Sequence, residues 1–98
     1  MTDPRKPAVS GRFYADDPAQ LRAQVQGCFT HEIGPGTMPD AVGGPPSIGG
    51  LVVPHAGLPF SGPIAAHAYA ALAESGSPRS VVILGPNHTG RGPPVALA

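Results

Sequence analysis

Two short apolar runs separated by a helix-length segment constrain the fold of this 98-residue chain more than any other feature. The runs are residues 51–53 (Leu-Val-Val) and 80–84 (Ser-Val-Val-Ile-Leu), and residues 61–73 between them have alanines and other apolar side chains at helical spacing. Two buried-type strands joined through a helix predict a βαβ unit with parallel strands and a right-handed crossover. We therefore predict an α/β fold.

Each apolar run is followed by a loop that carries a histidine. His55 comes shortly after Val53, and His88 comes shortly after Leu84. Parallel strands place both carboxyl ends at one edge of a sheet, where open α/β sheets bind ligands. Because neighbouring strands lie ~4.8 Å apart, the two imidazoles can converge on one small ion. Three glycines are expected to keep these loops tight: Gly57, Gly85 and Gly90.

A first helix is predicted to begin at Asp17. Its side chain can cap free backbone N–H groups, Pro18 suits the first helical position, and Gln20 completes a capping-box pattern. An apolar stripe follows at helical spacing: Leu21, Val25, Cys28 and Phe29. Cys28 belongs to this stripe, and we interpret it as a small buried hydrophobe rather than a reactive thiol.

Glycine and proline, at 14 residues each, dominate the middle of the chain. Residues 34–50 lack any periodicity and are predicted to form a long loop inside a single domain that spans residues 1–98. The 41% of apolar residues excludes a disordered composition. Many of these residues are alanines, so the core is expected to be small and the stability of the chain alone marginal.

The charge pattern excludes several classes of partner. Six basic and six acidic residues cancel, and no basic patch alternates with aromatic residues, so we predict no nucleic-acid binding. No apolar run approaches the ~20 residues of a membrane helix, and the first residues do not resemble a signal peptide. A single cysteine excludes an internal disulfide framework. A cytoplasmic protein is the expectation.

Short motifs rich in Pro, Gly and His recur along the chain: Gly11-Arg12-Phe13-Tyr14, Pro54-His55-Ala56-Gly57, Ser61-Gly62-Pro63, Ala66-His67-Ala68-Tyr69 and Ile83-Leu84-Gly85-Pro86-Asn87-His88. Together they resemble the Memo family, whose bacterial and archaeal members are called AmmeMemoRadiSam system protein B. The similarity runs from about Arg5 to the end and is weak in the middle. It departs at Leu58-Pro59-Phe60, where the family usually has aromatic residues.

The resemblance implies a fold and a metal site. The fold would be a three-layer α/β domain related to class III extradiol dioxygenases, of which this chain resembles only the N-terminal third. His55 and His88 would be two ligands of iron, copper or zinc. The third ligand would be a cysteine far downstream, which is not Cys28. We therefore expect the chain to be a fragment of a larger protein or a shortened gene product.

The resemblance leaves two functions open. The first is a metal-dependent oxidoreductase related to the extradiol dioxygenases, acting on a small molecule that the sequence does not identify. The second is a non-catalytic binding or scaffold protein that works with the AMMECR-type domain protein and the radical-SAM protein of the same system. The residues themselves also allow His55 and His88 to bond loop backbone without a metal, or residues 85–90 to bind a phosphate through loop N–H groups.

Other chemically interesting residues are interpreted as structural. His67 lies in the predicted helix, where no strand end delivers it to the site, and His31 lies at a predicted helix end. Residues 11–14 are expected to form a strand or turn that packs two aromatic side chains, Phe13 and Tyr14, on the domain; the alternative is that Arg12 or Tyr14 lines the metal pocket.

Overall fold

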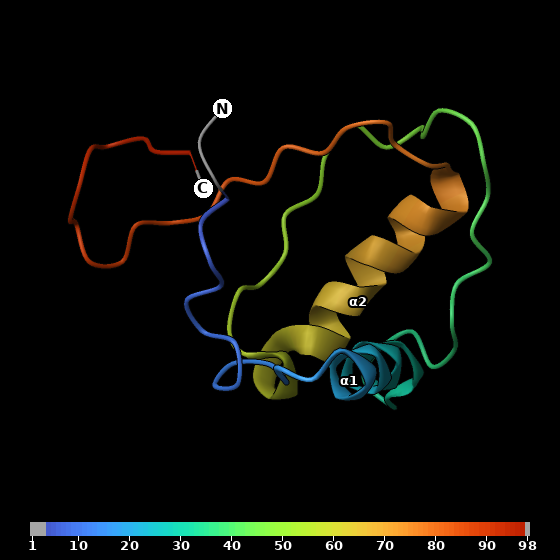
Figure 1. Cartoon of the computed structure of the whole chain (residues 1–98). Helices are drawn as coiled ribbons and strands as arrows, with labels where there is room; N and C mark the ends of the chain where they lie inside the picture. Colours follow the sequence, from blue (N-terminus) through green and yellow to red (C-terminus); the bar gives the residue numbers. More distant parts are fainter. Residues whose placement is uncertain (1–3, 98) are drawn as a thin grey trace.

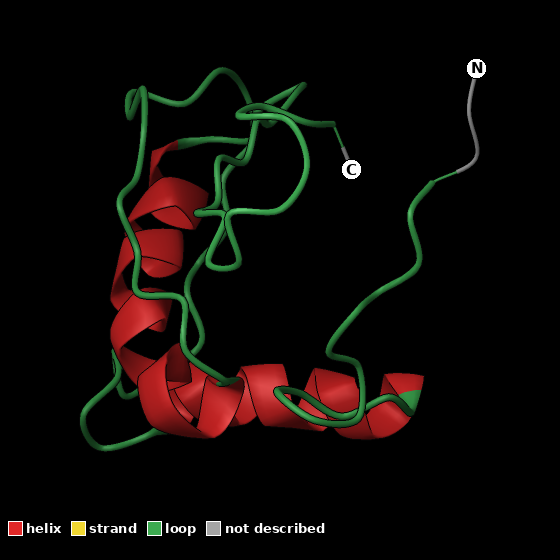
Figure 2. Ribbon diagram, turned by 90° about the vertical axis from the view of Figure 1, so that its left-hand side faces the viewer, coloured by secondary structure: helices red, strands yellow, loops and turns green. Residues whose placement is uncertain are grey.

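Two helices organise the structure. The computed structural model describes residues 4–97, in which α1 (Pro18–Thr30) and α2 (Leu58–Ser75) are joined and followed by long connections (Figure 1). The helices meet as an L, with the N-terminal part of α2 lying against α1 (Figure 2). Within residues 4–97 there is no β-strand, and one isolated bridge pairs Ser10 with Tyr14.

The predicted βαβ unit with parallel strands is therefore wrong for this chain, as is the α/β layering built on it. Residues 51–53 and 80–84 run as separate loop segments, with no backbone hydrogen bond between them in the described part of the chain (Figure 1). A parallel pair is stable only when both faces are covered and further strands extend the sheet. Here α2 covers one side alone, and Val82 and Leu84 remain 85% and 91% exposed.

The start of α1 confirms Asp17 as the predicted cap, whereas the described residues show no bond from the Gln20 side chain that would complete a capping box. The Asp17 carboxylate accepts a hydrogen bond from the backbone N–H of Gln20 at 2.9 Å, and Pro18 follows in the first turn. The capping residue thus satisfies a backbone donor that has no partner inside the helix. Cys28, on the predicted apolar stripe, is buried as expected.

Helix α2 begins earlier than predicted, at Leu58 instead of Ser61. Gly57 is the N-cap residue, and Pro59 lies in the first turn, where a missing N–H costs nothing. Pro63 therefore stands inside the helix, and α2 bends in its N-terminal half (Figure 1). Ser61, the first residue of the predicted helix, donates its hydroxyl to the carbonyl of Ala56 at 3.0 Å.

The core is small and is formed by residues of both helices. Its buried apolar residues are Cys28, Ala66 and Ala70. Gly62 permits the contact, because a Cβ at this position would overlap the Sγ of Cys28. The small side chains let the helices approach closely but bury little apolar area, so the free energy gained per residue is low.

The Gly/Pro-rich connection is tied to the C-terminal end of α2. The backbone N–H of Val42 donates to the carbonyl of Ala73 at 3.0 Å. Ser77 adds two bonds, from its N–H to the carbonyl of Gly44 and from its Oγ to the carbonyl of Val42, each 2.8 Å long. A segment without regular structure is thus held by backbone groups that the end of α2 leaves available.

Neither α1 nor α2, the helices of the described residues, is long and apolar enough to cross a membrane.

We expect the thiol of Cys28 to react slowly in the native protein. Desolvation by burial raises the pKa of the Cys28 thiol, so the thiolate is scarce at neutral pH, and the helix contact also hinders access. Labelling with a disulfide-exchange reagent should be roughly tenfold or more slower in buffer than in denaturant. Equal rates in the two conditions would show that the α1–α2 contact is not formed.

Candidate metal centre

His55 lies in the loop that leads into α2, and two hydrogen bonds fix this loop in place. The Ser61 hydroxyl donates to the carbonyl of Ala56, the residue after His55. The N–H of Leu58 donates to the carbonyl of Phe13 at 2.9 Å, so the N-terminal segment braces the start of the helix. The position of His55 is thus set by residues of α2 and of the N-terminal turn.

His88 lies in a loop that Asn87 organises. The Asn87 side chain accepts bonds from the N–H of Gly90 at 3.0 Å and from the hydroxyl of Thr89 at 3.1 Å. It also donates to the carbonyl of Arg91 at 2.8 Å. This is the local bonding by which asparagine stabilises turns. Because the N–H of Gly90 is already engaged, it does not point at a bound phosphate.

The two histidines meet. The Nε2 atoms of His55 and His88 lie 3.0 Å apart, and the ring centroids are 5.2 Å apart with the planes tilted by 32°. Two imidazole nitrogens at ~2.0–2.1 Å from one ion, at angles between octahedral and tetrahedral values, would be about 2.9–3.4 Å apart. The observed separation therefore fits two ligands of a shared metal ion.

A direct hydrogen bond explains the same distance. If one Nε2 carries a proton, it can donate to the other across 3.0 Å. A shared metal requires the opposite arrangement, with both protons on the Nδ1 atoms and both Nε2 lone pairs directed at the ion. The hydrogen-bonded state contains no metal and the other contains one ion, so metal titration distinguishes them.

Two ligands do not complete a site. No group of three or more His, Cys, Asp or Glu side chains within residues 4–97 is placed to hold a metal ion. Both histidines are exposed, so their ring nitrogens are open to a further ligand. A complete centre therefore needs donor atoms from outside these residues.

The other candidate residues have structural partners. His67 lies within hydrogen-bonding distance of the carbonyl of Ile33, with 2.9 Å between Nε2 and the oxygen, so it joins α2 to the loop after α1. His31 accepts a bond from the N–H of Ile33 through Nδ1 at 3.2 Å. The segment with Arg12 and Tyr14 forms a tight turn, closed by a 2.8 Å bond from the N–H of Gly11 to the carbonyl of Tyr14.

The three glycines expected to tighten the loops differ in their roles. Gly90 has a φ of +70°, a conformation that favours glycine. Gly57 has an ordinary φ, but a Cβ there would lie 3.2 Å from the carbonyl oxygen of Phe13. An added Cβ at Gly85 would meet open space, and nothing in the structure requires a glycine there.

Sequence reasoning missed the supporting residues Ser61 and Asn87. An asparagine three residues before a glycine is a recognisable turn signal, so the role of Asn87 in the His88 loop was open to prediction. The bond from Ser61 to Ala56 had no such signal, because it depends on where α2 begins.

Comparison with known proteins identifies the family. The family model for Memo-like proteins matches residues 5–98. A MEMO1 family protein of Methanopyrus kandleri is 59% identical over 92 residues, which cover 94% of this chain and 32% of the relative. MEMO1 family proteins of Methanothermobacter thermautotrophicus and Metallosphaera sedula are 55% and 53% identical over 93 and 95 residues, each covering 95% of this chain and 33% of the relative.

No solved structure matches the chain. The chain spans about a third of the length of the curated relatives it matches. His55, His88 and the short motifs rich in Pro, Gly and His all fall inside the region that the family model covers, and the chain therefore belongs to the Memo-like protein family.

Proposed function

We propose that His55 and His88 are two ligands of a metal centre in a Memo-family protein. The observation that carries the proposal is the 3.0 Å separation of their Nε2 atoms, which suits two ligands in neighbouring coordination positions. The remaining ligands come from outside the residues described. Asn87 and Ser61 hold the two loops, so their part is to position the imidazoles rather than to bind the ion.

Iron, copper and zinc are the metals that this donor set favours. Imidazole nitrogen binds all three, and a cysteine as third ligand would shift the preference toward softer ions such as copper. When bound, a redox metal would supply the electron transfer and the oxygen chemistry of an oxidoreductase. The chain itself orients the two imidazole rings and leaves them exposed to solvent.

The function proposed first is a metal-dependent oxidoreductase acting on a small molecule. A second candidate is a scaffold protein, with an AMMECR-type domain protein and a radical-SAM protein as partners. Large apolar side chains that remain exposed near the histidine loops favour this alternative, because such surface commonly marks a protein interface: Val52, Val82, Ile83 and Leu84.

Titration with Fe(II), Cu(I) and Zn(II) tests the metal proposal, on this chain co-expressed with the downstream part of a Memo-family chain that supplies the remaining ligands. We expect binding of one ion per chain, with X-ray absorption showing imidazole nitrogen in the coordination sphere. Affinity should fall as the pH is lowered, because protons compete for the ligand nitrogens. No saturable binding of any of the three ions, or coordination without imidazole, would contradict the proposal.

Oxygen consumption then separates the two functions. The metal-loaded protein, prepared together with the downstream part of a Memo-family chain, is incubated with catechol-type compounds under oxygen. Metal-dependent oxygen uptake supports the oxidoreductase. Retained metal without uptake, together with co-purification of the partner proteins, supports the scaffold.

A further inference from the structure

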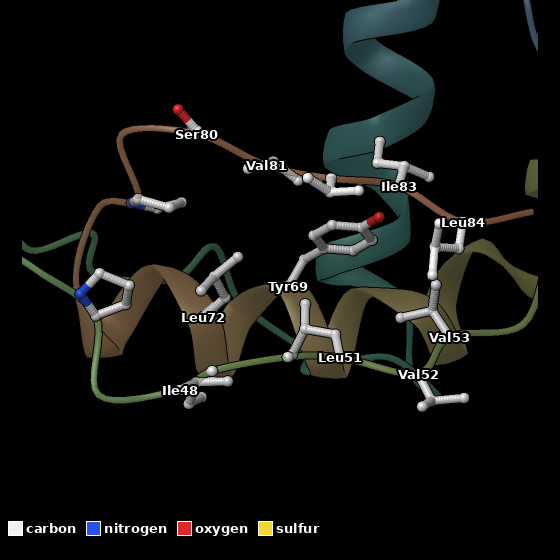
Figure 3. A pocket seen from close by; sticks show the side chains of 15 residues that line it. Ile48, Leu51, Val52, Val53, Tyr69, Leu72, Ser80, Val81, Ile83 and Leu84 are labelled. Carbon is white, nitrogen blue, oxygen red and sulfur yellow. The ribbon is translucent and has the colours of Figure 1, made fainter. Parts of the chain in front are cut away.

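The loop that carries His55 is fixed by hydrogen bonds on one side only. Residues 51–53 lead into this loop and line an apolar pocket together with Tyr69 and Leu72 of α2 (Figure 3). Across residues 4–97, no backbone–backbone hydrogen bond involves residues 51–53. The bonds that place the loop therefore lie on its other side, at the start of α2.

The N-terminal turn, residues 9–14, lies beside the start of α2 and supplies one of these bonds (Figure 1). The carbonyl of Phe13 accepts the N–H of Leu58 at 2.9 Å. Leu58 is the first residue of α2, so its N–H has no partner inside the helix. The approach is close, because a Cβ added at Gly57 would lie 3.2 Å from the same carbonyl oxygen.

The N-terminal turn is closed by bonds of its own. The N–H groups of Arg12 and Phe13 both donate to the carbonyl of Val9, at 3.0 Å and 2.9 Å. The N–H of Gly11 donates to the carbonyl of Tyr14 at 2.8 Å. These bonds make the turn one unit, so a displacement at its C-terminal end also displaces the carbonyl that receives α2.

Gln24 of α1 holds that C-terminal end. Its side-chain oxygen accepts the N–H of Ala15, the residue after the turn, at 2.9 Å. The bond is partly buried, which limits competition from water. Nine positions separate the two residues, so the bond ties the turn to α1 rather than closing a local loop.

We propose that Gln24 is a positioning residue for the ligand His55, an inference that rests on the metal centre proposed above. Gln24 fixes Ala15, and the N-terminal turn then presents the carbonyl of Phe13 to the start of α2. The imidazole pair keeps its 3.0 Å separation only while the His55 loop keeps its place. A residue that orients a ligand changes metal affinity without touching the ion.

Three variants separate this role from a general effect on α1. Gln24→Ala removes the acceptor of the bond, whereas Gln24→Glu keeps an oxygen at the same position. Gln26→Ala is the matched control, because Gln26 is exposed on the same helix and accepts a bond through its backbone carbonyl. Alanine favours helix, so circular dichroism should show the same helix content in all three.

Amide hydrogen exchange tests the connection without metal, on this chain in the presence of a chelator. We expect Gln24→Ala to speed exchange about tenfold or more at Ala15 and also at Leu58, whose N–H depends on the N-terminal turn. Gln24→Glu should restore both rates, and Gln26→Ala should leave them unchanged. Faster exchange at Ala15 with Leu58 unaffected would overturn the proposal, because the bond would then act only locally.

Zn(II) affinity is the second measurement, on the co-expressed preparation used for the metal titration. We expect Gln24→Ala to lower affinity about tenfold, and Gln24→Glu and Gln26→Ala to stay within about threefold of the original. If His55→Ala weakens binding but Gln24→Ala does not, the positioning role is overturned and the metal centre stands. If the unchanged chain binds no ion, the metal centre itself is overturned, and the positioning role with it.

Discussion

Replacing either His55 or His88 with alanine is expected to weaken metal binding at least about 100-fold. Loss of a residue that only holds a metal ligand in place already lowers metal affinity by about 10–100-fold, and loss of the ligand itself should cost no less. Each substitution leaves a single imidazole, because no third His, Cys, Asp or Glu joins the pair in the part of the chain that the structure describes. One nitrogen cannot chelate an ion. Isothermal titration with Zn(II), at a pH where imidazole is neutral, measures the loss directly.

His31→Ala is the matched control, since it removes an exposed imidazole whose bond in the described structure is to the N–H of Ile33, near the end of α1. It should leave metal affinity within a few-fold of the original. Circular dichroism should show the same helix content in all three variants, because His55 and His88 lie outside α1 and α2. Metal affinity unchanged by His55→Ala and His88→Ala would leave the 3.0 Å contact as a hydrogen bond alone.

Gly76→Ala is expected to cause a large loss of stability, because it combines backbone strain with steric overlap. Gly76 ends α2 with φ +148° and ψ −171°, a backbone region that is essentially restricted to glycine. A Cβ there would also lie 2.6 Å from the Cα of Pro46 and 2.8 Å from the carbonyl oxygen of Gly44. These are backbone atoms, so no side-chain rotation relieves the overlap.

The strain alone costs about 1–3 kcal/mol, and the overlap forces residues 44–46 away from the end of α2. The bond from the N–H of Ser77 to the carbonyl of Gly44 would then be lost. Because ~1 kcal/mol shifts the Tm of a chain of this size by about 4–8 °C, we expect a decrease of about 10–20 °C in thermal unfolding.

Gly43→Ala is the control for Gly76→Ala. Gly43 lies in the same connection, has an ordinary φ, and has open space where the Cβ would be added. Its Tm should stay within about 3 °C of the original or rise slightly, since alanine restricts the unfolded chain more than glycine does. Similar decreases for the two variants would mean that residues 42–46 are not packed on α2.

Interactions within one helical turn decide where the two helices begin. The beginning of α1 follows from Asp17 and Pro18, because a capping carboxylate and a proline act within one helical turn. The sequence pattern predicts that the second helix begins at Ser61. The structure shows that a proline in the first turn, after Gly57, allows the helix to begin at Leu58.

The convergence of His55 and His88 shows a different relation between sequence and structure. The prediction reached this pair through neighbouring parallel strands, and those strands are absent from residues 4–97. The rings nevertheless lie within 3.0 Å of one another. Bonds made by Ser61, Phe13 and Asn87 hold the loops, so the meeting of the two histidines does not require a ladder between the segments that precede them.

The amino-acid sequence alone determined the family motifs, the capping of α1, the burial of Cys28 and the choice of His55 and His88 as candidate ligands, because each depends on residue type and short-range spacing. Only the tertiary structure decided whether residues 51–53 and 80–84 pair. An apolar run encodes a preference for an extended, buried conformation, but a strand exists only when a partner supplies its hydrogen bonds and cover. In this chain α2 supplies part of the cover and no backbone partner, so both segments stay extended and open.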